Sequence, residues 1–253
     1  MTKKLSPKGS ESNTLFHEFL AQLNGYIDYE KAKFYPKFFK AGPGEYAEGD
    51  QFLGVTVPNQ RKVAKKFADK FTLSEIALAL NSEWHEVRLT GLFILVLKFQ
   101  KTKDSRYRQD IAEFYLKHTK CINNWDLVDT TAPQILGEYL LDRDKKPLYK
   151  LAKSNDLWEN RIAVLSCFTF IRRCEFDDIL FFCELFLNHP HDLIHKATGW
   201  MLREVGKKDI KTLLGFLEKY HHKMPRTMLR YAIEKLPEKQ RKYWLTKESC
   251  QKR

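Results

Sequence analysis

Apolar residues recur along most of the chain at the spacing of a helix face. In the segment TVPNQRKVAKKFADKF, Val63, Ala64 and Phe67 lie three and four residues apart, which places them on one side of a helix. Pro58 lies near the first turn of this helix, where a missing amide hydrogen costs no hydrogen bond. No stretch alternates apolar and polar residues in the manner of a strand meander. The pattern therefore predicts an all-α protein.

Helix-breaking segments divide this pattern at steady intervals and predict roughly a dozen helices. The breakers lie at residues 41–45, 101–105, 142–147, 188–192 and 223–225. Residues 1–13 are polar and are predicted to form a disordered N-terminal tail. Residues 14–246 are predicted to form a single α-helical domain, followed by a C-terminal tail at residues 247–253.

Five segments align with one another as internal repeats: RLTGLFIL, DTTAPQIL, RIAVLSCF, KATGWMLR and RYAIEKLP. Their first residues are Arg88, Asp129, Arg161, Lys196 and Arg230, and successive first residues lie 32 to 41 positions apart. This period is typical of HEAT or armadillo repeats, in which helix pairs stack to bury a continuous core. The alignment predicts a HEAT-like helical repeat solenoid, C-shaped, with a concave basic groove.

The charge of the chain favours polyanionic partners, either nucleic acid or an anionic membrane surface. There are 44 Lys and Arg against 32 Asp and Glu, a formal net charge of +12. The first column of the repeat alignment holds four bases and one acid, Asp129. A row of bases on one surface is suited to a phosphate backbone, although charges also occupy the solvated edges of ordinary helices. The acid argues against the second interpretation, because a carboxylate weakens phosphate binding and so calls for a function of its own.

Two tryptophans lie one helical turn from members of this charged column. Trp125 precedes Asp129 by four residues and Trp200 follows Lys196 by four, so each shares a helix face with its charged neighbour. Each tryptophan is either a core residue, the commoner role in a helical array, or an indole exposed beside the charge. Asp126 is a second acid in the same segment and competes with Asp129 for a functional role. Its place in the first turn of a helix, however, fits a favourable interaction with the helix dipole.

The chain lacks the patterns of several other classes of protein. Its longest apolar run, LFILVL, is far shorter than the ~20 residues of a membrane span, and its first residues lack the apolar segment of a secretory signal. The five cysteines form no CxxC pair and are expected to be reduced thiols. His191 and His195 lie four residues apart, but no Cys ligand lies at zinc spacing. We therefore expect no metal and no cofactor. The GPGE segment lacks the GK[ST] of a phosphate loop, so we expect no nucleotide hydrolysis.

Four ordered blocks carry a resemblance to a known family. They are FLGVTVPNQRKVAKK, NNWDLVDTTAPQILGEYL, WENRIAVLSCFTFIR and HKATGWMLREVGKKD, and the match as a whole runs from about Phe52 to Leu236. In this order they resemble the AlkD family of DNA alkylation repair glycosylases, which fold as HEAT-like repeats. An N-terminal groove tyrosine of the family falls near Phe38 or Phe39, and no residue is assigned to it.

The resemblance implies a DNA glycosylase that excises positively charged N3- and N7-alkylated purines from duplex DNA without a base-flipping pocket. It identifies Asp129 as the catalytic aspartate, Arg161 as the groove arginine, and Trp125 and Trp200 as groove tryptophans. Alkylation makes the purine a cation that leaves as a neutral base, so one carboxylate that stabilises the oxocarbenium-like sugar can suffice. With Arg and Lys around it, Asp129 is expected to remain ionised at neutral pH.

Arg161 is expected to contact a phosphate beside the lesion, and Arg88, Lys196 and Arg230 to bind phosphates as well. The expected partner is double-stranded DNA with alkylated purines, bound by a monomer in the cytoplasm and on the nucleoid, with no membrane involved. The alternative function is a non-catalytic HEAT-repeat protein that binds damaged or branched DNA.

Overall fold

The computed structural model describes residues 14–247, and these residues form an all-α fold. They contain no strand, and an isolated β-bridge joins Gln51 to Trp84. The prediction of an all-α helical array is confirmed. The chain divides into two compact units, one ending at Leu127 and the other beginning at Val128. The two predicted tails lie almost wholly outside the described residues.

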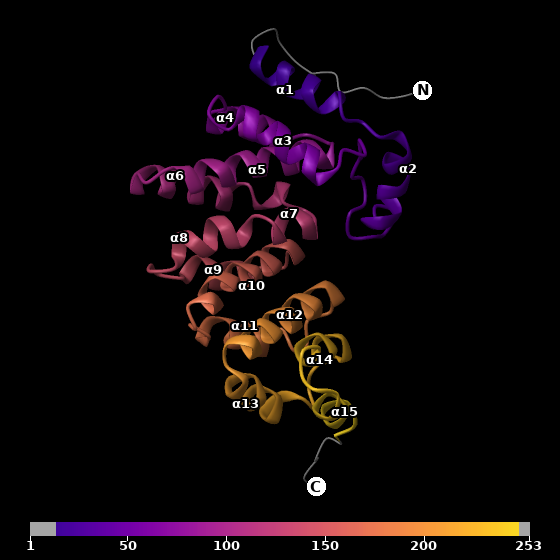
Figure 1. The fold of residues 1–253 in the computed structure, drawn as a ribbon, viewed down its shortest axis with the longest axis vertical. Helices are drawn as coiled ribbons and strands as arrows, with labels where there is room; N and C mark the ends of the chain where they lie inside the picture. Colours follow the sequence, from indigo (N-terminus) through magenta and orange to yellow (C-terminus); the bar gives the residue numbers. More distant parts are fainter. Residues whose placement is uncertain (1–13, 248–253) are drawn as a thin grey trace. The chain divides into compact units, whose positions relative to one another are not determined.

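In the first unit, α5 is the central helix (Figure 1). Helices α3 and α4 both pack against it, α6 follows it, and α1 packs on α3. The contact with α4 is close, because a Cβ atom at Gly91 would lie 2.8 Å from the Cβ of Ala79. The helices are α1 (Thr14–Asn24), α2 (Tyr29–Phe38), α3 (Val57–Phe67), α4 (Leu73–Leu80), α5 (His85–Lys101), α6 (Ser105–Lys117) and the 3-10 turn η1 (Thr119–Cys121).

The short helix α7 (Trp125–Asp129) spans the boundary between the units. The second unit continues with a π-helical turn, η2 (Pro133–Gly137), in which the ordinary hydrogen-bond pattern is interrupted. The other helices are α8 (Glu138–Leu140), α9 (Lys146–Ala152), α10 (Leu157–Arg172), α11 (Asp177–Leu185), α12 (Asp192–Lys208), α13 (Ile210–Tyr220), α14 (Arg226–Ile233) and α15 (Glu238–Thr246).

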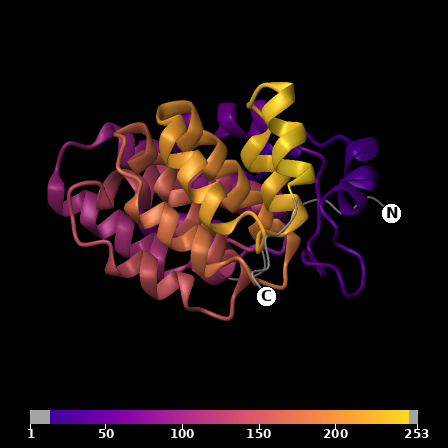
Figure 2. The same cartoon turned by 90° about the horizontal axis from the view of Figure 1, so that it is seen from below.

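The second unit is a stack of successive helices, as expected of a helical repeat. Helix α10 packs against α9, η2 and α12, and α12 in turn packs against α13 and α14. Figure 2 gives a second view of this stack. Helices α12 and α14 come very close at Gly199, where a Cβ atom would lie 2.5 Å from the backbone oxygen of Met228. The predicted C shape and concave groove of the whole molecule stay predictions.

Candidate functional site

The carboxylate of Asp129 forms a two-point ion pair with the guanidinium of Arg161. Nε of Arg161 donates to Oδ1 of Asp129 at 2.8 Å, and Nη2 donates to Oδ2 at 2.7 Å. The third nitrogen, Nη1, donates to the backbone oxygen of Leu193 at 2.6 Å. The arginine side chain is 6% exposed and the aspartate side chain 16% exposed. A bidentate pair of this kind fixes the orientation of the carboxylate as well as its charge.

Local sequence explains where the two partners lie. Helix α10 begins after Asp156, whose carboxylate accepts hydrogen bonds from the backbone amides of Trp158 and Glu159. This cap fixes the start of the helix, so Arg161 falls in its second turn. Asp129 is the last residue of α7 and is followed closely by the π-helical turn. The side chains therefore come from two helices, and a local signal sets the start of the second one.

Asp126, the competing acid, has a different partner. Its Oδ2 lies 2.8 Å from Nε2 of His85, while Nδ1 of the same imidazole lies 3.1 Å from Oδ2 of Asp50. The histidine is 1% exposed and Asp126 is 7% exposed. Asp126 thus belongs to a buried polar cluster that joins helices α5 and α7 to the segment before Gln51. This role goes beyond the helix-dipole interaction expected from sequence.

The charge state of His85 follows from these two carboxylates. Burial lowers the pKa of His85, but the charge of Asp126 and the hydrogen bonds to both carboxylates outweigh burial and raise it from 6.5 to about 9. Burial also raises the pKa of Asp50, but its hydrogen bond to His85 and the charge of Arg88 more than offset this, so that the pKa of Asp50 is lowered. At neutral pH the imidazole is therefore a cation that donates from both nitrogens.

Arg88 belongs to the same cluster. Its Nη2 donates to Oδ1 of Asp50 at 2.7 Å and to Oδ1 of Asn123 at 3.0 Å, and its Nη1 donates to the backbone oxygen of Ser82. The residue is 5% exposed. A phosphate contact by Arg88 stays a prediction, and it would require the guanidinium to exchange a buried carboxylate for the phosphate.

Trp125 begins α7 and lies on a layer of aromatic rings in the first unit. Its amide donates to the side chain of Asn124 at 2.8 Å. The indole stacks on the buried ring of Phe39 with centroids 5.5 Å apart and planes at 25°, and the ring of Phe38 meets it at 66°. The tryptophan remains partly exposed. It is therefore neither fully buried core nor a freely rotating surface side chain.

Trp200, Lys196 and Arg230 lie on α12 and α14 in the second unit. The indole nitrogen of Trp200 donates to Glu204 at 3.2 Å, so this ring too is held in one orientation. Lys196 is 41% exposed and pairs with Asp192 at 2.9 Å, one turn earlier on the same helix. Arg230 is exposed. These two bases are open to solvent, in contrast to Arg88 and Arg161.

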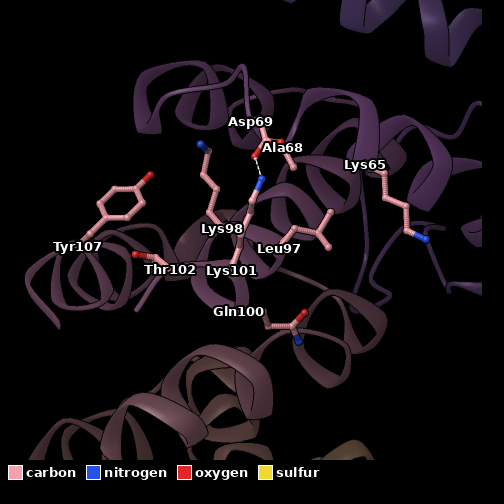
Figure 3. Close-up of a pocket in the computed structure, with 9 residues that line it drawn as sticks. All are labelled: Lys65, Ala68, Asp69, Leu97, Lys98, Gln100, Lys101, Thr102 and Tyr107. Atoms are coloured by element: carbon pink, nitrogen blue, oxygen red, sulfur yellow. Dashed lines mark hydrogen bonds and ion pairs between the residues drawn. The ribbon is translucent and has the colours of Figure 1, made fainter. Parts of the chain in front are cut away.

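A basic hollow lies at the far end of α5 from Arg88 (Figure 3). Its volume is about 510 Å³, and its lining includes Lys65, Lys98, Lys101 and Tyr107. Lys101 forms an ion pair with Asp69 at 2.6 Å. Lys101 lies thirteen positions after Arg88 in α5, a rise of ~20 Å along the helix. None of the residues predicted for the site lines this hollow.

Sequence reasoning selected Asp129, Arg161 and the tryptophans as candidates, and it missed the buried groups that surround Trp125 and Asp126. Phe39, His85 and Asp50 are far in sequence from the acids and rings they contact. A buried histidine between two acids has no local signature, because its partners lie 35 and 41 residues away. The available signal was compositional: charged residues at the start of α5, in a segment that is otherwise strongly apolar.

Within residues 14–247, no group of three or more His, Cys, Asp or Glu side chains is placed to hold a metal ion. No helix of this part combines the length and the apolar character that crossing a membrane requires. The four cysteines described, Cys121, Cys167, Cys174 and Cys183, are free thiols, and Cys250 lies outside the described residues.

Fold and charge together define a basic, all-α helical-repeat protein in which a carboxylate is held by an arginine and two indoles are held in place. The chain belongs to the DNA alkylation repair enzyme family, whose model matches residues 19–236. A solved structure described as "Predicted DNA alkylation repair enzyme from Enterococcus faecalis" has a similar fold, with a TM-score of 0.64 and 13% sequence identity. The similarity covers 84% of this chain and 97% of that one. No curated protein sequence matches the chain.

Proposed function

We propose that this DNA alkylation repair protein is a monofunctional glycosylase that hydrolyses the N-glycosidic bond of N3- and N7-alkylated purines in duplex DNA. Asp129 is the catalytic residue. Arg161 holds it in position, and Trp125 and Trp200 contact the DNA at the lesion. Lys196 and Arg230 bind phosphates in a concave groove.

The chemistry suits a single carboxylate. When the bond between C1′ and the alkylated purine breaks, its electron pair returns to the ring and cancels the positive charge of the base. The departing base is therefore neutral and needs no proton from a general acid. Positive charge develops on the sugar instead, where Asp129 stabilises it while water attacks C1′. The water loses its proton to solvent or to the carboxylate.

The observation that carries this proposal is the ion pair between Asp129 and Arg161. Two hydrogen bonds to a guanidinium at 2.7 and 2.8 Å fix the direction of the carboxylate and place it against a positive charge. The aspartate side chain is 16% exposed, so a sugar can approach it from solvent. Asp126 is a weaker candidate, because its carboxylate already compensates a buried imidazolium.

The basic hollow of Figure 3 is a poor candidate for a pocket that binds the lesion. Three lysines and a single carboxylate, that of Asp69, are among the residues that line it. A cationic purine placed there would face a net positive charge, which opposes binding. We therefore propose that the protein recognises the sugar and the positive charge of the lesion through the carboxylate of Asp129.

One observation favours a second candidate, a non-catalytic protein that binds damaged or branched DNA. Arg161 engages both oxygens of Asp129 and so compensates its negative charge. In that case the pair would connect two helices and have no role in excision. The two candidates make opposite predictions for turnover.

The deciding experiment is incubation of the protein with methylated duplex DNA, followed by quantification of released 7-methylguanine and 3-methyladenine. The glycosylase predicts release that increases with enzyme concentration and exceeds spontaneous depurination. Tight DNA binding with release at the spontaneous rate would favour the non-catalytic candidate.

A further inference from the structure

Helix α2 presents two exposed aromatic side chains next to lysines. Phe34 and Phe38 lie one turn apart with 55% and 50% of their surfaces exposed, and their ring centroids are 5.9 Å apart. Lys33 and Lys37 each precede one of these rings and are also exposed. We call these four residues the α2 ridge.

The inner side of the ridge is held by buried aromatic packing. Phe38 meets the indole of Trp125 at a centroid distance of 5.9 Å. Phe39, which is 8% exposed, stacks on Trp125 and on Phe52 at centroid distances of 5.5 and 5.2 Å. The ridge is therefore the exposed edge of a continuous aromatic layer that includes one of the predicted DNA-contacting residues.

The backbone at Gly54 anchors the start of α2. Gly54 has φ of +79°, and a Cβ atom there would lie 2.0 Å from the backbone oxygen of Asp28. The amide of Gly54 donates to the buried carboxylate of Glu86 at 2.8 Å. Asp28 caps α2 by accepting from the amides of Glu30 and Lys31. The ridge is thus preorganised, so that binding a ligand orders few further groups.

The charge around the rings determines which kind of partner fits them. Glu30 is the only acid within α2, and its ion pair with Lys33 at 2.8 Å is largely exposed to solvent and therefore weak. An apolar surface of another protein could pack on the rings but would offer the lysines no negatively charged group. An unpaired nucleotide suits the rings and the lysines together, because its base offers a π face and its phosphate a negative charge.

We propose that the α2 ridge binds unpaired bases of DNA, with Phe34 and Phe38 stacking on the bases and Lys33 and Lys37 contacting phosphates. This inference rests on the proposed function for its place in repair. Excision leaves an abasic position, and the base opposite then has no pairing partner. The ridge lies beside Trp125, where such a base would become available.

The test measures binding of the full chain to two fluorescently labelled duplexes, one fully paired and one with two unpaired thymines in the same sequence. Phe34 is the residue to change, because its ring does not contact Trp125. We expect Phe34→Ala to weaken binding to the DNA with unpaired thymines by about fivefold or more. Binding to the paired duplex should change less than twofold.

Two further variants make the result specific. Phe34→Tyr keeps an aromatic face and should retain the affinity for unpaired thymines. Phe181→Ala removes a ring that is 44% exposed on α11, away from the ridge, and should leave both affinities unchanged. Neither DNA contains a lesion, so binding in this test does not depend on excision. A protein without glycosylase activity could therefore still bind unpaired thymines through the ridge. An equal loss for both duplexes would overturn the inference. The inference would also be overturned if the wild-type chain sedimented as a dimer and the Phe34→Ala variant as a monomer.

Discussion

At the scale of single residues, two aspartates three positions apart have opposite surroundings. Asp129 is held by a guanidinium and is partly exposed, whereas Asp126 is buried against an imidazolium. The first arrangement leaves part of the carboxylate exposed to solvent. The second uses the carboxylate to compensate a charge that the protein itself has buried. Their chemistry therefore differs although their sequence context is shared.

This contrast predicts the effects of two substitutions. Asp129→Asn keeps the size of the side chain but removes the negative charge, so release of 7-methylguanine should fall by about 10²- to 10³-fold. Affinity for unmodified DNA should be retained. Asp126→Asn should lower stability and have a much smaller effect on release per folded molecule. Near-native release by Asp129→Asn would contradict its assignment as the catalytic residue.

His85 makes stability depend on pH. Its pKa is 6.5 when unfolded and about 9 when folded, so its contribution is fully present below pH 6.5 and is lost as pH rises through 9. The shift corresponds to about 3 kcal/mol. Above pH 9 the neutral ring can donate from only one nitrogen and leaves one carboxylate facing a lone pair.

Urea unfolding of the wild-type protein between pH 6 and 9.5 tests this prediction. We expect the free energy of unfolding to fall across that interval, and to fall less in Asp126→Asn, which removes the largest charge that raises the pKa of His85. The same pH dependence in both proteins would show that His85 is not its source.

At the scale of helices, glycine sets the distance between neighbours. Gly91 and Gly199 occupy the same position of the repeat alignment, three residues after Arg88 and Lys196, and each meets an adjacent helix closely. Small residues at this position let the backbones approach one another. The alignment therefore captured a packing feature that recurs in both units.

Gly199→Ala is predicted to separate α12 from α14. Its Cβ atom would lie 2.5 Å from the backbone oxygen of Met228 and 2.7 Å from the Cβ of Tyr231, so the helices must move apart, at a cost of ~1–3 kcal/mol. Gly215→Ala is the matched control, because nothing lies within 4 Å of its added Cβ atom. That variant should be as stable as wild type or up to ~1 kcal/mol more stable. Thermal unfolding of the two variants distinguishes these outcomes.

Helices and their breakers were predictable because their signals are local. The capping box from Thr72 to Glu75 at the start of α4 is an example, because four consecutive residues form it. The cluster around His85 was not predictable, since its members come from segments that only the folded chain brings together. The same reason explains why the stacking of Phe39 on Trp125 escaped the sequence analysis. Asp129 and Arg161 were found through a repeat alignment, which is itself a long-range signal.

At the scale of the whole molecule, the net charge of +12 should make DNA binding strongly dependent on salt. Each phosphate contact that is removed should lower the slope of log K against log salt by about 0.9. Lys196→Ala and Arg230→Ala together are therefore expected to reduce the slope by about 1.8. Lys146→Ala removes an exposed charge outside the column and should change the slope little. An unchanged slope in the double variant would indicate that the column is only a solvated edge.

Recognition of the lesion by charge predicts a distinctive range of substrates. If Asp129 stabilises the sugar and no pocket encloses the base, the size of the alkyl group has little influence on the barrier. The leaving base must be positively charged, because a carboxylate alone cannot expel a poor leaving group. Bulky N3 or N7 adducts should therefore be released at rates within about tenfold of 7-methylguanine, whereas hypoxanthine and uracil should remain in the DNA. Parallel release assays on duplexes that differ only in the lesion measure this range. Efficient removal of hypoxanthine, or rejection of every adduct larger than methyl, would show that the protein selects its substrate by fit and not by charge.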